Sequence, residues 1–429
     1  MTLDSPRAVS TAASATSTSR LASARSQLLN GPAILVLALC FNSAGVFAFH
    51  IVVSRLLGPS RYGALGALLA LALILSVASG AVTMAVTQRV AASPPATGWS
   101  IARQYRVVGV GCLVLAVAGA CGAAEIKHYL HLGTLTPVVL LVLFGEVVLC
   151  GLVPRGVLVG QHRYRLMGGA VAIGAVVRVI AGAALAPAFG TSGAIAAYGA
   201  AEGATTLIAL VGVVRHRQRG DAVSELNVSW RSLGLALAAF GGMWTFSATD
   251  TFLARHLLSS VGAGIYVAAS VAGSAALWLP YTVTGSVFAR LSAEAHAEDT
   301  KGRDFRNSLV ATVLMAGGIC VALVLVPGLV IRVLFGASYE ASARVLVFLA
   351  VSNGLQGVTG FLVSHQLAHR RWTVLLPWAG VVGLVTAIYL HHQTPRAIAL
   401  AAVLVSLALC VAVLAGSVRI VTGSPRHRD

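Results

Sequence analysis

Residues 31–87 read GPAILVLALCFNSAGVFAFHIVVSRLLGPSRYGALGALLALALILSVASGAVTMAVT, two apolar runs joined by a short polar turn. A helix that spans the hydrocarbon core of a bilayer needs roughly 20 predominantly apolar residues. Both runs reach that length, and the charged residues between them, Arg55 and Arg61, suit a membrane–water interface. The stretch therefore predicts two transmembrane helices connected by a tight turn.

The same pattern continues along the whole chain of 429 residues. Hydrophobic residues make up 57% of it and charged residues 10%, and the mean hydropathy is +0.86, far from the composition of a soluble domain. The helix-length apolar segments are 31–54, 62–87, 105–124, 135–153, 167–188, 192–214, 233–254, 262–288, 308–331, 343–366, 373–391 and 397–418. The linkers are too short for a soluble domain, so the sequence predicts an all-α integral membrane protein of about twelve transmembrane helices.

The positive charges predict the orientation in the membrane. Most of the 30 Lys and Arg lie in the N-terminal tail, in alternate loops and in the C-terminal tail. These alternate loops are 88–106, 155–167, 215–232, 290–307 and 369–372. The positive-inside rule puts this face, and both termini, in the cytoplasm. The net charge of +17 is spread over many short loops without interleaved aromatic residues, so we expect no nucleic-acid partner.

A weak internal repeat divides the chain. Arg55-Leu56-Leu57-Gly58 follows the first segment, and Arg255-His256-Leu257-Leu258 follows the seventh. An offset of six segments predicts two six-helix lobes in the same orientation, related by a pseudo-two-fold axis along the membrane normal. The predicted parts are a disordered tail (1–30), an N-lobe (31–214), a cytoplasmic linker (215–232), a C-lobe (233–421) and a second tail (422–429). The alternative is a single bundle of twelve helices.

Four charged residues fall inside apolar segments: Glu146, Arg178, Glu202 and Asp250. A charge at mid-bilayer costs about 2.5–3.5 kcal/mol on insertion scales, so it faces a partner or a cavity. One hypothesis is structural, with Glu146 paired to Arg178 and Asp250 to Arg255. The other makes Arg178 a ligand for an anionic headgroup and the carboxylates relays for protons or cations.

Polar amides inside the segments add a second set of candidates. Asn42, Asn353 and Gln356 could line a cavity, or could hydrogen-bond neighbouring helices together. The predicted substrate-binding residues are Arg178, Asp250, Glu146, Asn42 and Arg255. The predicted ion-coupling residues are Asp250, Glu202 and Glu146.

Other apparent motifs predict no chemistry. The six cysteines all lie in apolar stretches and are interpreted as small packing residues. His365 and His369 have a metal-ligand spacing but no nearby carboxylate, so we expect no metal site. The chain has only 13 acidic residues, and it shows neither a Ser/His/Asp set nor a paired Asp motif. We therefore expect neither a cofactor nor an enzymatic activity.

Several short motifs, in order, resemble the polysaccharide-biosynthesis (oligosaccharide flippase, Wzx-like) family of the multidrug/oligosaccharidyl-lipid/polysaccharide exporter superfamily. They are Arg55-Leu56-Leu57-Gly58-Pro59 with Tyr62-Gly63; Arg155-Gly156 with Gly160-Gln161 and Arg163-Tyr164; Asp250 with Leu257-Leu258 and Gly264-Ile265-Tyr266; Pro280 with Phe288-Ala289-Arg290-Leu291-Ser292; and Leu334-Phe335-Gly336 with Tyr339. The family usually has Pro where this chain has Ala289.

The resemblance implies a transporter in a bacterial plasma membrane. Two lobes would form a V around a cavity that opens alternately to either face, and would flip a polyprenyl-diphosphate-linked oligosaccharide from the cytoplasmic to the outer leaflet for cell-surface polysaccharide assembly. Implied partners are the lipid-linked oligosaccharide, the bilayer, protons or sodium, and glycan polymerase or glycosyltransferases. Two alternatives stay open: a multidrug or metabolite cation antiporter of the same superfamily, which an acidic cavity would favour, and a membrane scaffold for glycan-assembly enzymes, docking through loops 215–232 and 290–307.

Overall fold

The computed structural model describes residues 32–92, 101–215, 230–280, 301–369 and 371–422, and this part of the chain is helical and contains no β-strand. The α-helices are α2 (Pro32–Ala92), α3 (Ile101–Tyr129), α4 (Thr136–Gly160), α5 (Tyr164–Arg215), α6 (Trp230–Leu257), α7 (Ser260–Gly273), α9 (Lys301–Leu325), α10 (Pro327–Leu334), α11 (Ala343–Ala368), α12 (Leu376–Leu390) and α13 (Pro395–Thr422). Two short 3₁₀ helices, η2 (Ala337–Ser342) and η3 (Trp372–Leu375), precede α11 and α12. The predicted tails, and most of loops 215–232 and 290–307, lie outside the described residues.

Helices α2 and α5 are each a pair of helices joined at one glycine. Gly58 (φ 69°, ψ 170°) and Gly190 (φ 59°, ψ −135°) have backbone angles outside the helical region, with the positive φ that glycine adopts readily. The arms of α2 fold back on each other, since the Nδ1 atom of His50 lies 2.9 Å from the hydroxyl of Tyr62. The arms of α5 also contact each other beside the kink, because a Cβ on Gly193 would lie 2.1 Å from the carbonyl oxygen of Leu185.

Each of these hairpins counts as two membrane crossings, and this count matters for the comparison with the predicted number. Nine described helical stretches are long and apolar enough to cross a membrane, and two of them are the double-length hairpins α2 and α5. Together with α6, the described helices agree with about twelve crossings. Many large apolar side chains on them are exposed, among them Leu314 at 70% and Leu325 at 74%. Such a surface suits hydrocarbon rather than water.

One predicted segment is wrong in its extent. Residues 308–331 were expected to form a single helix, but α9 ends at Leu325 and the short helix α10 starts at Pro327. Proline has no amide hydrogen to donate, and it disfavours the helical region for the residue before it. Val326 accordingly has φ −130° and ψ 47°.

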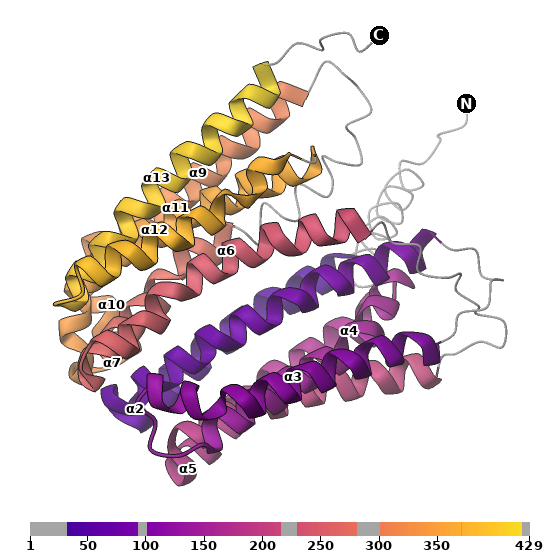
Figure 1. The fold of residues 1–429 in the computed structure, drawn as a ribbon, viewed down its shortest axis with the longest axis horizontal. Coiled ribbons are helices and arrows are strands. Elements are labelled where there is room, and N and C mark those ends of the chain that lie inside the picture. The colour runs from indigo at the N-terminus through magenta and orange to yellow at the C-terminus, as the bar shows by residue number, and fades with distance from the viewer. Residues whose placement is uncertain (1–31, 93–100, 216–229, 281–300, 370, 423–429) are drawn as a thin grey trace, which may run out of the picture.

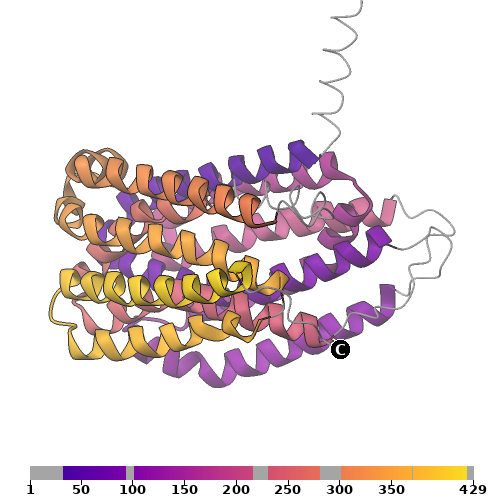
Figure 2. The ribbon, with the colours of Figure 1, turned by 90° about the horizontal axis from the view of Figure 1, so that it is seen from above.

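The helices form two lobes (Figure 1). One contains α2 to α5 and the other α6 to α13. The lobes converge near α7 and α10 and spread apart toward the opposite end. The second view shows the helices running roughly along one common direction (Figure 2). The predicted two-lobe architecture is therefore confirmed.

The converging ends are held in close backbone contact, and we call this region the closed end. A Cβ on Gly63 of α2 would lie 2.7 Å from the amide nitrogen of Gly264 of α7, and a Cβ on Gly264 would lie 1.9 Å from the carbonyl oxygen of Pro59. Tyr339 of η2 donates a hydrogen bond to the carbonyl oxygen of Ser54 over 2.8 Å. Small residues thus let the lobes approach, and the Tyr62-Gly63 and Gly264 motifs of the sequence meet here.

Candidate functional site

A cavity of about 270 Å³ lies between the lobes. Its walls come from both arms of α2, from α6, from α7 and the residues that follow it, and from α11. Its polar lining residues are Asn42, Ser43, His50, Ser247, Thr251, Ser270, Ser274 and Asn353, and Phe47 and Trp278 are its aromatic ones. Within the described part of the chain, no Asp, Glu, Lys or Arg lines this cavity.

The polar lining follows from helical spacing. Ser247 and Thr251 of α6 are four residues apart, as are Ser270 and Ser274, so each pair projects from one face of a helix. Trp278 stacks on Trp244 with ring centroids 4.8 Å apart and an angle of 16° between the planes. The cavity therefore offers hydrogen-bonding groups beside a flat aromatic surface.

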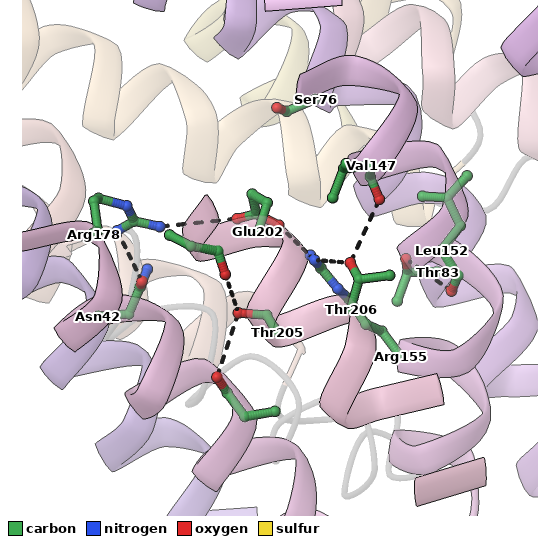
Figure 3. Close-up of polar contacts among 12 residues, drawn as sticks. Asn42, Ser76, Thr83, Val147, Leu152, Arg155, Arg178, Glu202, Thr205 and Thr206 are labelled. Atoms are coloured by element: carbon green, nitrogen blue, oxygen red, sulfur yellow. Dashed lines mark hydrogen bonds and ion pairs between the residues drawn. The ribbon is translucent and has the colours of Figure 1, made fainter. Parts of the chain in front are cut away.

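Arg178, a predicted substrate ligand, is buried behind this cavity in α5. It donates to Oδ1 of Asn42 over 3.1 Å (Figure 3). Its guanidinium carbon lies 4.9 Å from the ring centre of Tyr198. Its Nη2 atom lies 3.9 Å from a carboxylate oxygen of Glu202. Asn42 lines the cavity, so Arg178 contacts the cavity wall through Asn42.

Glu202 is shared between two arginines. Its second carboxylate oxygen accepts a 2.5 Å hydrogen bond from Arg155 of α4, which also donates to the hydroxyl of Thr206 over 3.0 Å (Figure 3). We name Arg155, Arg178 and Glu202 the arginine–glutamate cluster. It carries a net charge of +1 when all three groups are ionised. The burial of that charge is compensated in part by Asn42 and by the face of Tyr198.

Arg155 is a residue that the sequence interpretation missed, because it was assigned to the cytoplasmic loop after the fourth segment. Helix α4 continues to Gly160, so Arg155 lies more than a turn inside it. One sequence signal pointed to this pairing. Glu202 and Thr206 are four residues apart on α5 and present a carboxylate and a hydroxyl on one face.

The predicted ion pair between Glu146 and Arg178 is wrong. Arg178 faces Glu202, whereas Glu146 lies beside Cys112 of α3 and keeps a buried carboxylate oxygen without a hydrogen-bond partner. The two residues are on consecutive helices, but their positions around each helix axis direct them to different neighbours.

Asp250 of α6 is 4% exposed, and both of its carboxylate oxygens accept hydrogen bonds. Its Oδ2 accepts from the hydroxyl of Tyr266 over 2.8 Å, and its Oδ1 accepts from the amide and the hydroxyl of Thr251 over 2.6 and 3.2 Å. The Thr251 hydroxyl in turn lies 3.3 Å from that of Ser270, and both of these residues line the cavity. The hydroxyl groups of Thr251 and Ser270 therefore lie between this carboxylate and the cavity.

Arg255 does not pair with Asp250, contrary to the prediction. Five residues along an α-helix turn through about 500°, which places the two side chains roughly 140° apart. Arg255 instead donates to the carbonyl oxygen of Leu130 over 3.0 Å, on the other lobe. It lies outside the cavity lining.

The remaining predicted polar residues separate into two groups. Asn353 lines the cavity, whereas Gln356 donates to Ser352, whose hydroxyl lies 3.0 Å from that of Ser406 on α13. Asn353 thus fits the cavity interpretation and Gln356 the helix-packing one. In the described ranges, no three His, Cys, Asp or Glu side chains come together as metal ligands.

Comparisons with known proteins give a fold and no sequence family. No family model matches the chain, and no curated protein matches it. Among solved structures, the lipid II flippase MurJ in an inward closed conformation is similar with a TM-score of 0.68 and 11% identity, over 89% of this chain and 87% of that one. A multidrug resistance MATE family transporter of the MOP superfamily, in an inward-facing conformation, has a TM-score of 0.62 and 14% identity over 89% and 96% of the two chains. A mutant of the Vibrio cholerae MATE transporter VcmN has a TM-score of 0.62 and 14% identity over 93% and 98%. At these identities the likeness establishes the fold alone.

Proposed function

We propose that the protein flips a polyprenyl-diphosphate-linked oligosaccharide from the cytoplasmic to the outer leaflet by alternating access between its lobes. The observation that carries the proposal is the hydroxyl-rich cavity between the lobes, whose described lining contains no Asp, Glu, Lys or Arg, beside the Trp244–Trp278 stack. Sugars present many hydroxyl groups and flat apolar faces, which need hydrogen-bonding side chains and aromatic surfaces. The known structures with this fold include a lipid II flippase.

The same cavity argues against the cation antiporter. A site for organic cations would present carboxylates, and the described cavity lining contains none. Asp250 keeps this alternative open, since it is one hydroxyl layer away, and transporters of the MATE family share the fold. The scaffold hypothesis depends on loops 215–232 and 290–307, which lie mostly outside the described residues.

The charge distribution supports a direction of transport. The described helix ends that border the Arg-rich loops, among them the last turn of α5 and the first turn of α9, lie at the end where the lobes spread apart, and the positive-inside rule assigns that end to the cytoplasm. We therefore assign 31–214 and 233–421 as the two lobes of a bacterial plasma-membrane protein with both termini cytoplasmic. In this proposed orientation, the closed end faces the outside of the cell.

The two engaged carboxylates suit different tasks. Glu202 lies between two guanidinium groups, where an additional sodium ion or proton would meet positive charge. Asp250 has no arginine beside it and connects to the cavity through Thr251 and Ser270. We propose Asp250 as the ion-coupling residue. The arginine–glutamate cluster would supply positive potential for the diphosphate, with Arg178 holding Asn42 in the cavity wall.

The test is a deletion in the native host, followed by mass spectrometry of lipid-linked sugars on each membrane face. We expect a complete lipid-linked intermediate to accumulate on the cytoplasmic side and to disappear when the wild-type gene is restored. Asn42→Ala and Asp250→Asn should reproduce the accumulation at normal protein levels. A lipid-linked pool that does not change on deletion would overturn the proposal.

A further inference from the structure

Two arginines bridge the lobes at the closed end. Arg55, at the end of the first arm of α2, donates from Nη2 to the carbonyl oxygen of Val333 over 2.5 Å. Arg255, near the end of α6, donates to the carbonyl oxygens of Leu130 and His131 over 3.0 and 3.4 Å. Each bond joins a side chain of one lobe to the main chain of the other.

The acceptors share a chemical property. Leu130 and His131 follow the last turn of α3, and Val333 lies in the last turn of α10. The final carbonyl groups of a helix lack partners within the helix and carry the negative end of its dipole. A guanidinium group is a strong donor to such oxygens, and it remains charged at any physiological pH.

The two contacts are equivalent under the internal repeat. Arg55 ends the first span of one lobe and Arg255 the first span of the other. Arg255 reaches the turn directly after α3, and Arg55 reaches the last turn of α10, which follows α9. Near the axis between them, Gly63 meets Gly264, eight and nine residues after the respective arginines. Reciprocal contacts of this kind are what a two-fold interface produces.

We propose that Arg55 and Arg255 form a pair of symmetry-related latches that hold the closed end shut and that both open when access switches to that face. Because each latch binds only main-chain oxygens, water can replace the other lobe as the partner once the lobes part. The latches are therefore reversible. This role does not depend on which substrate is carried.

The latches are unequal in their surroundings. Arg255 is 7% exposed and contacts several carbonyl groups, whereas Arg55 is exposed and contacts one. Loss of one hydrogen bond from a charged donor changes an equilibrium by roughly tenfold or more. We expect Arg55→Gln to raise the ratio of open to closed molecules about tenfold, Arg255→Gln by at least as much, and the double variant by about a hundredfold.

Spin-label distance measurements on the full-length protein in lipid nanodiscs test this. The labels replace Thr134, in the turn between α3 and α4, and Gln393, between α12 and α13, which are both exposed at the closed end. The six native cysteines are first changed to alanine. The expected result is a short distance in the parent protein and a growing long-distance fraction in R55Q, R255Q and the double variant.

Arg396→Gln is the matched control, because Arg396 is an exposed arginine at the same end, next to the turn between α12 and α13. It should leave the distance distribution unchanged. Arg55 is exposed, so R55Q keeps the test decisive even if R255Q folds poorly. Distances in R55Q and in the double variant that match those of R396Q would overturn the proposal.

Discussion

Replacing Glu202 by Gln removes the carboxylate that buried Arg178 and partly buried Arg155 share. Arg155 and Glu202 are 17% and 20% exposed, and Arg178 is 6% exposed. Breaking a fully buried ion pair costs about 3–5 kcal/mol, because the remaining charge stays buried without its partner. Since these groups retain some exposure, we expect a loss of about 2–3 kcal/mol in the free energy of unfolding.

A double-mutant cycle with Arg155→Gln separates the ion pair from other effects. R155Q removes one guanidinium and leaves Glu202 beside Arg178, and R155Q/E202Q leaves only one unpaired arginine. The stability loss of the double variant should therefore be smaller than the sum of the single losses by about 1 kcal/mol or more. Arg163→Gln, in the turn after α4, provides a control with a change of less than about 0.5 kcal/mol.

The assay is the thermal unfolding midpoint of purified protein in detergent, followed by size-exclusion chromatography after heating at a series of temperatures. Membrane proteins of this size unfold irreversibly, so all variants must be heated at one rate. We expect E202Q to unfold several degrees below the wild type. The unfolding midpoint of R155Q/E202Q should lie close to that of E202Q. Strictly additive losses would refute the proposed sharing of Glu202.

Three further predictions concern the cavity and the closed end. Asp250→Asn keeps an oxygen acceptor for Tyr266 but removes the negative charge. The free energy of unfolding should therefore change by less than about 1 kcal/mol, while ion-coupled transport in proteoliposomes falls at least tenfold. A variant with unimpaired coupling would exclude Asp250 as the ion site. Gly264→Ala places a Cβ 1.9 Å from the carbonyl oxygen of Pro59, so the distance between spin labels at Thr134 and Gln393 should lengthen. Gly317→Ala should leave that distance unchanged, because its Cβ meets nothing within 4 Å, and equal distances in both variants would contradict the close packing. Trp278→Ala removes the aromatic wall of the cavity, so we expect the lipid-linked intermediate to accumulate on the cytoplasmic side at normal protein levels. An amount of lipid-linked intermediate equal to that of the wild type would argue against stacking of the sugar on Trp278.

Much of the fold could be predicted from local chemistry. The apolar segments correspond to the observed helices, and the turn Arg55-Leu56-Leu57-Gly58-Pro59 marks the hairpin of α2, where Gly58 adopts a positive φ. The six-segment offset also correctly indicated two lobes. The break between α9 and α10 was missed although Pro327 signals it, because the apolar composition continues across it.

The partners of the buried charges could not be predicted in the same way. Sequence showed that Arg178 and Asp250 need compensation, and both have it, but from Glu202, Asn42 and Tyr266 rather than from Glu146 and Arg255. Glu202 was named as a charge inside a segment, and Tyr266 only as part of the motif Gly264-Ile265-Tyr266. What was missing was the direction in which each side chain points relative to its neighbours.

The sequence by itself indicated an all-α membrane protein of about twelve crossings, with a few buried charges that must be compensated, and its orientation stays a prediction. The transfer of apolar segments into hydrocarbon and the cost of burying a charge are properties of each segment alone, so they can be read along the chain. The tertiary structure decided that Arg155 joins Glu202 and that Arg255 crosses to the carbonyl groups of the other lobe. Those contacts depend on how each helix is rotated about its axis and where the lobes meet, and packing between segments far apart in sequence sets both.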